Sequence, residues 1–79
     1  MSDQAIAKVT ALVAETLGVP AAKVNAGSSI DNLPEWDSEA HMDICLAFEA
    51  RFGIALDMDA IGEMTSVQAL ARMVGKAGA

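Results

Sequence analysis

The fold is decided by residues 35–56, which read EWDSEAHMDICLAFEARFGIAL. Asp37 stands where a polar segment gives way to a helical pattern. An aspartate there can accept a hydrogen bond from a backbone N–H two or three residues on, and its charge complements the helix dipole. We therefore expect a helix that begins at Asp37. Its inward face is predicted to consist of Ile44, Cys45, Phe48 and Phe52.

Gly53 provides the end of this helix. A glycine at that point can adopt the left-handed conformation, and Ile54 can then fold back as a hydrophobic contact. A short third helix is predicted over about Met58 to Gly62.

The segments on the N-terminal side form a helix and a long loop. A helix from about Asp3 to Leu17 has one apolar stripe, and Gly18 followed by Pro20 stops it. The stripe comprises Ile6, Val9, Val13 and Leu17. The loop runs from about Val19 to Trp36, and loops of this length in compact domains are usually functional or pinned to the core. The residues expected to pin it are Val24, Ile30 and Leu33.

The last helix is predicted from Thr65-Ser66-Val67-Gln68, which fits a capping box. Its stripe, which lies before Gly75, comprises Val67, Leu70, Ala71 and Val74, and a frayed tail is expected over Lys76–Ala79. We predict one all-α domain over residues 1–79, a small four-helix bundle of three main helices and one short helix, with a long loop between helices one and two. A chain of 79 residues buries a modest core. The scarcity of aromatic residues also disfavours a strand-rich domain.

The formal charge of −6 is unevenly spread. Residues 31–63 hold nine acidic residues and one basic residue, a net of −8, and the flanks hold two acidic and four basic residues, a net of +2. Nucleic acid is therefore not an expected partner, because phosphate binding requires the opposite sign. The acidic middle suits basic patches on other proteins, with an encounter that weakens as salt rises. The alternative is a surface that serves solubility alone.

A single cysteine, Cys45, cannot form an internal disulfide, and its apolar neighbours favour a core position. The nearby acidic residues Asp43 and Glu49 would raise its pKa. No signal peptide precedes the first helical segment, and no apolar run approaches the ~20 residues that span a bilayer. We expect a cytoplasmic monomer that is not embedded in a membrane.

Three kinds of catalytic or metal site can be weighed against the sequence. Ser38 and His41 lie three residues apart, but a nucleophile pair also needs an oxyanion hole and a substrate pocket, which a chain of this size scarcely supports. His41 more simply packs against Trp36 in a staple-like contact. A calcium loop beginning at Asp57 fails because Ile61 falls at a ligand position. No cysteine and histidine residues have zinc spacing. We expect no metal site and no catalytic residues.

The same stretch, residues 35–56, resembles the acyl carrier protein family. In that family Asp-Ser-Leu opens the second helix, an apolar and acidic helix follows, and Glu-x-x-Phe-Gly-Ile closes it. Residues 64–68, MTSVQ, resemble the family's start of helix four, without a gap between. The resemblance spans nearly the whole chain.

This resemblance implies a carrier and not an enzyme. A phosphopantetheinyl transferase would use coenzyme A and magnesium to join 4'-phosphopantetheine covalently to the Ser38 hydroxyl, and Asp37 would help to position the metal in that complex. The arm's thiol would hold acyl or related groups as thioesters. Acyl-loading and acyl-transfer enzymes would use their own basic patches to bind Glu39, Asp43 and Glu49 of this chain.

Glu39 departs from the family pattern, in which leucine or another apolar residue follows the serine. The Trp-Asp-Ser form is more similar to stand-alone carriers of specialised pathways than to the housekeeping carrier of fatty acid biosynthesis, so a lipid or specialised biosynthetic pathway is expected. The alternative is an unmodified acidic adaptor that binds a basic partner protein.

Overall fold

The structure, a computed structural model, describes residues 3–76 of the chain. Its helices are α1 (Asp3–Leu17), the 3₁₀ turn η1 (Ala21–Lys23), α2 (Ser38–Phe52), α3 (Met58–Glu63) and α4 (Val67–Lys76). Within the described residues no strand forms, and a single isolated bridge pairs Ser29 with Ser66. The prediction of an all-α bundle with three main helices and one short one is confirmed. The predicted fraying concerns residues 77–79, which lie outside the described part, and Lys76, which is the last residue of α4.

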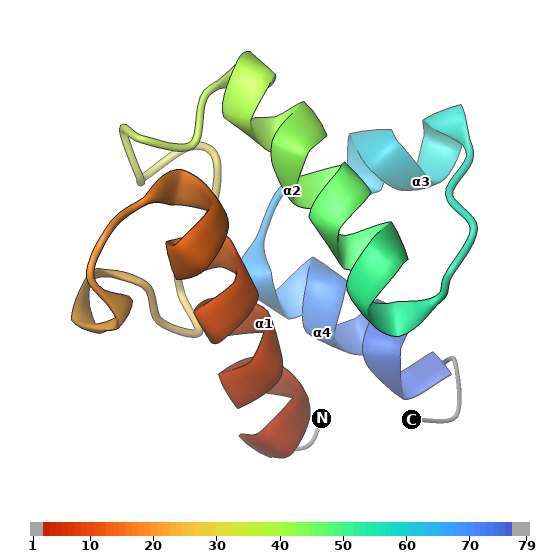
Figure 1. The fold of residues 1–79 in the computed structure, drawn as a ribbon, viewed down its shortest axis with the longest axis horizontal. Coiled ribbons are helices and arrows are strands. Elements are labelled where there is room, and N and C mark those ends of the chain that lie inside the picture. Colours follow the sequence, from red (N-terminus) through yellow and green to blue (C-terminus); the bar gives the residue numbers. More distant parts are fainter. Residues whose placement is uncertain (1–2, 77–79) are drawn as a thin grey trace.

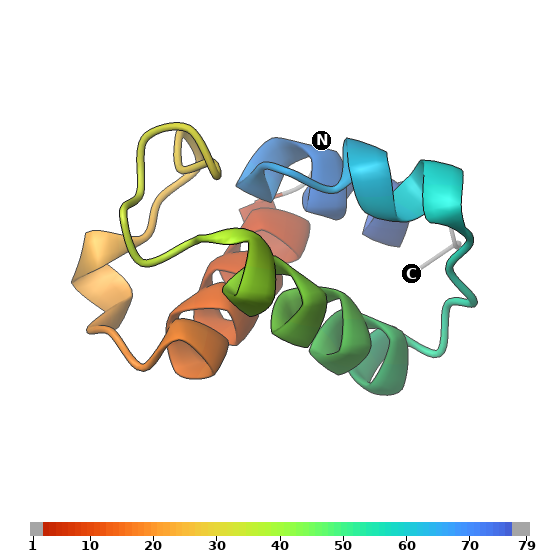
Figure 2. The same cartoon turned by 90° about the horizontal axis from the view of Figure 1, so that it is seen from above.

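The helices form two layers. Figures 1 and 2 show α1 and α2 in one layer, with α3 and α4 in the other. α1 packs against both α2 and α4, so it provides the centre of the bundle. The buried apolar side chains are Ala5, Val9, Leu12, Val13, Ala14, Val24, Leu33, Trp36, Ile44, Cys45, Phe48, Met64, Val67, Leu70, Ala71 and Val74. The predicted stripes of α1, α2 and α4 supply much of this core.

Two glycines end the long helices as the sequence predicts. Gly18 has φ +72°, its N–H donates to the Glu15 carbonyl, and the Val19 N–H donates to the Ala14 carbonyl. This pair of bonds satisfies carbonyls that the helix end would leave without partners. Gly53 has φ +66° and donates to the Glu49 carbonyl. Both turns redirect the chain within one residue.

The long loop between α1 and α2 is held at several points. Val24 and Leu33 are buried, and Ile30 is half-buried against the core. The Ile30 N–H donates to the Thr65 carbonyl (2.9 Å), and the Val67 N–H donates to the Ser28 carbonyl (3.0 Å). The loop is therefore bonded to the start of α4, far away in sequence. This confirms the predicted pins Val24 and Leu33 and adds a backbone attachment at Ile30.

An ion pair fixes the other side of the loop. The Lys23 ammonium, at the end of η1, contacts the Glu35 carboxylate just before α2. The hydrogen bond from Lys23 lowers the pKa of the Glu35 carboxyl. The contact ties the first turn after α1 to the residues that lead into α2.

The capping box predicted for α4 is wrong by one residue. The cap is Ser66, whose Oγ accepts a hydrogen bond from the Ala69 N–H (3.1 Å), and the helix begins at Val67. The physical reason is tertiary, because the Thr65 carbonyl is used by Ile30 and the chain enters the helix one residue later. Gln68 therefore does not stand at the position from which a capping-box side chain reaches back.

This register can be tested by substitution. Ser66→Ala should lower the free energy of unfolding by about 1 kcal/mol, because the Ala69 N–H loses its partner. Gln68→Ala, at an exposed site, should change it by less than about 0.5 kcal/mol. Chemical denaturation followed by circular dichroism measures both. The opposite order of effects would restore the capping box.

Candidate functional site

Ser38 is the first residue of α2 and its side chain is exposed. Asp37 precedes it as the N-cap, and its Oδ1 accepts a hydrogen bond from the Ala40 N–H (2.8 Å). No hydrogen bond within the described residues engages the Ser38 hydroxyl or the second Asp37 oxygen. The serine hydroxyl and one carboxylate oxygen are therefore both available, side by side in the chain, at the start of a helix.

The first turn of α2 has backbone donors to spare. The Ala40 N–H bonds to the Asp37 side chain and the His41 N–H to the Asp37 carbonyl. The N–H groups of Ser38 and Glu39 have no acceptor among the described residues. Free N–H groups at a helix N-terminus, together with the helix dipole, stabilise a negatively charged group such as a phosphate. A phosphate ester on Ser38 would thus be stabilised by these N–H groups while it remains exposed to solvent.

His41 and Trp36 lie buried directly beneath this turn. The Trp36 Nε1–H donates to His41 Nδ1 (3.0 Å), and the two rings stack at 6.1 Å between centroids. His41 Nε2 lies 2.8 Å from the Ile61 carbonyl oxygen of α3. The predicted contact between the two rings is confirmed. Both ring nitrogens have partners, so the ring has no nitrogen left to take a proton from Ser38, and the nucleophile-pair interpretation loses its base.

The bond from His41 to α3 is a feature that the sequence analysis missed. Helical spacing placed His41 near Trp36, but a main-chain acceptor 20 residues away leaves no pattern in the sequence. The available signal was a histidine on the inward face of a helix, four residues before the buried Cys45.

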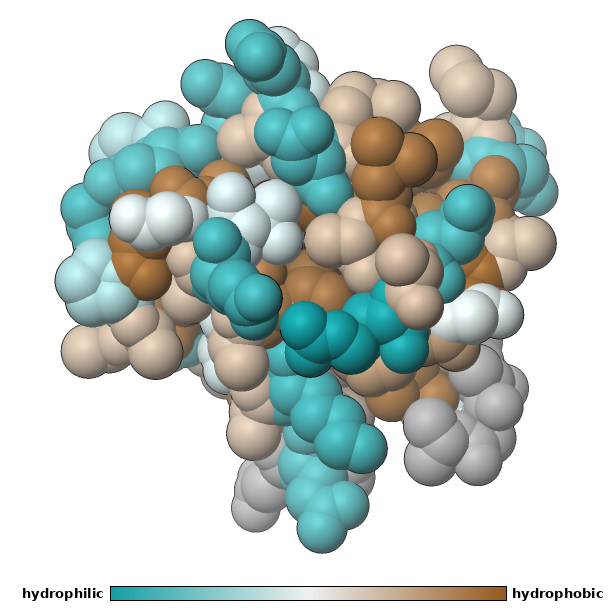
Figure 3. Space-filling model, viewed as in Figure 1, coloured by the Kyte–Doolittle hydropathy of each residue, from teal (hydrophilic) through white to brown (hydrophobic). Residues whose placement is uncertain are grey.

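The surface of α2 combines acidic and apolar side chains. Glu39, Asp43 and Glu49 are exposed as predicted, and Met42 and Leu46 are 47% and 63% exposed. Figure 3 shows apolar surface gathered where α2 passes α3, with hydrophilic surface around it. Spacings of three and four residues put Glu39, Met42, Asp43 and Leu46 on one face. The sequence analysis named the acids and overlooked the apolar members.

Glu49 has a second, structural role. Its Oε2 accepts a hydrogen bond from the Leu56 N–H (3.2 Å), in the segment that joins α2 to α3. A change at Glu49 therefore alters this connection as well as surface charge, whereas Asp43 has no such bond among the described residues. Asp57, the first residue of the rejected calcium loop, caps α3 by accepting from the Ala60 N–H (2.8 Å).

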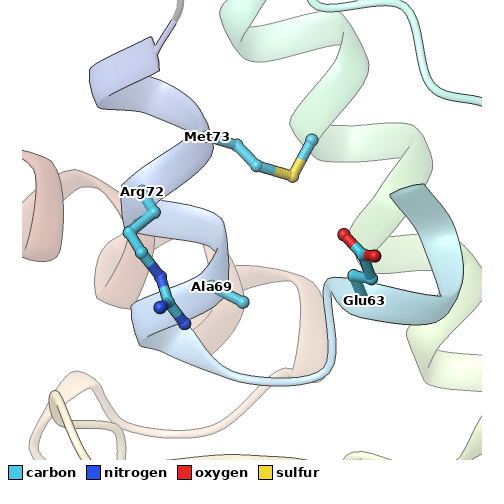
Figure 4. A pocket seen from close by; sticks show the side chains of 4 residues that line it. All are labelled: Glu63, Ala69, Arg72 and Met73. Carbon is cyan, nitrogen blue, oxygen red and sulfur yellow. The ribbon is translucent and has the colours of Figure 1, made fainter. Parts of the chain in front are cut away.

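Among the hollows on the surface of the described residues, two lie near the helices α2, α3 and α4. One of about 420 Å³ lies beside Ser38 and Asp37 and is lined by residues 30–34 of the loop together with Trp36. The other, of about 350 Å³, lies between α3 and α4. Figure 4 shows Met73 of α4 extending across this second hollow toward Glu63 of α3, while Arg72 points along α4 past Ala69. Only the first hollow adjoins the exposed serine.

Cys45 belongs to the core. Its side chain is 2% exposed, its Sγ lies 3.7 Å from His41 Nε2, and burial raises the pKa of its thiol. The predicted core position and the direction of the pKa shift are confirmed. The cause of the shift is desolvation, where the sequence analysis had assigned it to nearby acidic residues.

The thiol should therefore be unreactive in the folded, unmodified polypeptide. A thiol reagent reacts with an exposed thiolate, whereas the Cys45 sulfur is buried and burial raises its pKa, which favours the protonated thiol. A thiol reagent should label Cys45 slowly at neutral pH and rapidly in denaturant, as followed by absorbance or intact mass. Rapid stoichiometric labelling of the folded protein would contradict the burial of this side chain.

The described helices lack the length and apolar character needed to cross a lipid bilayer. A protein-family model described as a phosphopantetheine attachment site matches residues 7–74. The chain is also similar to an acyl carrier protein from Trieres chinensis, with 31% identity over 68 residues, which cover 86% of this chain and 85% of that protein.

Proposed function

The chain belongs to the acyl carrier proteins, which bear a covalent 4'-phosphopantetheine group, and we propose that Ser38 is the residue to which this group is attached. The observation that carries the proposal is the exposed Ser38 hydroxyl at the start of α2, which, like the two neighbouring backbone N–H groups, has no hydrogen-bond partner within residues 3–76. Ser28, by contrast, is buried, and the Ser29 and Ser66 hydroxyls accept hydrogen bonds from the Asp31 and Ala69 N–H groups.

The attachment step uses Ser38 as the nucleophile toward coenzyme A. Ser38 Oγ forms a bond to the phosphorus that bears the pantetheine and gives up its proton. The bond from that phosphorus to the nucleotide part of coenzyme A breaks, and the nucleotide leaves as a bisphosphate. The phosphodiester that results is stabilised by the unpaired N–H groups of the first turn. A phosphopantetheinyl transferase supplies the catalytic groups, since His41 has no free nitrogen to act as the base.

Asp37 is suited to assist in that complex. Its Oδ1 is committed to the helix cap, which fixes the carboxylate in place, and its second oxygen remains available to a magnesium ion brought by the transferase. The same side chain would thus orient the helix start and contribute a metal ligand.

Once attached, the arm's thiol holds an acyl or related group as a thioester. We propose that the chain acts as a carrier and not as a catalyst, in a lipid or other specialised biosynthetic pathway. Loading and transfer enzymes would meet the face that contains Glu39, Met42, Asp43 and Leu46, in which acids steer a basic partner and apolar side chains are buried on contact.

Substitution of the serine tests the attachment site. Ser38→Ala should abolish the phosphopantetheine mass increment that the parent gains with coenzyme A, magnesium and a broad-specificity transferase. Helical circular dichroism should be nearly unchanged, because the Ser38 side chain is exposed and its hydroxyl has no hydrogen-bond partner among the described residues. Ser28→Ala and Ser66→Ala are the matched controls and should still be modified. An increment that persists in Ser38→Ala would end the assignment, and a parent that gains none would favour the unmodified adaptor.

Glu39 offers a test of partner specificity. Glu39→Leu should raise the efficiency of a broad-specificity transferase, because a leucine buried in an apolar groove contributes about 1.5–3 kcal/mol. In such a groove glutamate would instead carry a desolvation penalty unless a cation met it. The free energy of unfolding should change by less than about 1 kcal/mol, since the site is exposed. Steady-state kinetics of modification measures the effect.

The control for this experiment is Gln68→Leu, which adds the same side chain at an exposed site on α4. It should leave modification unchanged. A dedicated partner that places a lysine or arginine at Glu39 should bind Glu39→Leu more weakly. Equal kinetics and equal affinities for parent and variant would remove Glu39 from the recognition surface.

A further inference from the structure

One buried ring joins three segments of the chain. His41 belongs to α2, accepts the indole N–H of Trp36 from the loop that precedes Ser38, and lies in hydrogen-bond range of the Ile61 carbonyl on α3. Both rings are buried, with Trp36 1% and His41 8% exposed. The proposed attachment site and α3 are thus connected through a single side chain.

The two partners determine which nitrogen carries the proton. An indole N–H can only donate and a carbonyl oxygen can only accept. His41 Nδ1 must therefore be the acceptor, and Nε2–H the donor, toward Ile61. The bonds to Trp36 and Ile61 thus use different ring nitrogens, and the Cys45 Sγ also lies 3.7 Å from Nε2.

α3 has few other attachments. None of its residues is fully buried, Ala60 and Ile61 pack only partly against the core, and Met58 is 82% exposed. Within the described residues, the His41 bond is the side-chain hydrogen bond that reaches α3 from another helix. The Glu49 carboxylate holds only the preceding segment, at Leu56. His41 therefore supplies the polar attachment of α3 to α2, beside the apolar packing of Ala60, Ile61 and the buried C-cap Met64.

We propose that His41 is a positioning residue that holds α3 in a fixed place relative to Ser38, so that a partner enzyme meets the serine, the α2 face and α3 as one surface. The proposal rests on the function proposed above. It is supported by the apolar surface where α2 passes α3 (Figure 3), and by the exposed apolar side chains of Met42 and Leu46 on α2 and Met58 on α3. A partner that contacts both helices needs their spacing to be preset, because ordering α3 on binding would reduce affinity.

A matched pair of amides separates the two bonds. His41→Asn places its amide where Nδ1 stood, so it can still accept from Trp36 but falls short of Ile61. His41→Gln places its amide where Nε2 stood, so it can still donate to the Ile61 carbonyl but not accept from Trp36. Val13→Ala is the control, because it weakens the core from α1, where Val13 is fully buried, without a substitution in α2 or α3.

Two readouts are needed, the kinetics of modification by the transferase and the hydrogen exchange of α3 amides. His41→Asn should raise the KM for the carrier roughly five-fold with kcat within about two-fold, because the contact surface is lost while Ser38 is intact. Hydrogen exchange should accelerate selectively at the Ile61 and Met64 amides, which donate backbone hydrogen bonds to the Asp57 and Ala60 carbonyls at the two ends of α3. His41→Gln should keep the parent's slow exchange in α3 and a KM near the parent's, and any effect of its lost Trp36 bond should fall on kcat, because that bond acts on the turn that contains Ser38.

Three results would overturn the proposal. They are an unchanged KM in His41→Asn, an equal rise in His41→Asn and His41→Gln, and an equal rise in Val13→Ala, which would reveal loss of stability alone. Should the parent accept no phosphopantetheine, the proposed function fails instead. The exchange of the α3 amides then still decides whether His41 holds this helix.

Discussion

The hydrogen bond between Trp36 and His41 determines where the start of α2 lies. Trp36 is the residue before the helix cap and His41 is the fourth residue of the helix, so the contact spans the first turn from the inside. The largest side chain of the core is thereby attached to the segment that contains Ser38. A buried indole N–H without a partner would cost about 1–3 kcal/mol, and the imidazole nitrogen removes that cost while it fixes the turn. Because the buried side of this turn is held by that hydrogen bond, the Ser38 hydroxyl on its exposed side can react without disturbing the turn.

Hydrogen bonds and buried side chains also anchor the long loop to the start of α4. The loop has no regular structure beyond η1, yet its backbone is bonded to the start of α4 through Ile30 and Val67. Its two buried side chains, Val24 and Leu33, add apolar contacts on either side of that attachment. A small domain buries a limited fraction of its surface, so such bonds between distant segments do much to define the loop. For α3 no comparable backbone bond to a distant segment is found within residues 3–76, and its attachments are the apolar packing of Ala60, Ile61 and the C-cap Met64 together with the bond to His41.

Local chemistry explains which features could be predicted from the sequence. Gly18, Asp37 and Gly53 act on their immediate neighbours, and the helix ends that they define are those expected. The apolar stripes were predictable because helical periodicity relates residues three and four apart. The cap of α4 was not, because the register is set by a bond between Thr65 and Ile30, 35 residues earlier. The bond from His41 to α3 escaped for the same reason, since a main-chain acceptor leaves no trace in residue identity.

The predicted site differs in character from residue to residue. The positions of Ser38 and Asp37 at a helix start could be predicted because they are a local property, whereas their roles stay proposals that rest on the family resemblance. The acids of α2 could be named, but only the structure separates Asp43, which has a free carboxylate among the described residues, from Glu49, which supports the segment before α3. Charge alone would treat these two residues as equivalent. The face around Ser38 is therefore better understood as a mixed surface, in which Met42 and Leu46 provide apolar area and Glu39 and Asp43 set the sign of the field. Long-range attraction depends on the acids, and close contact depends on the apolar side chains, because screening limits charge effects to about 8 Å at physiological salt whereas burial acts only on contact.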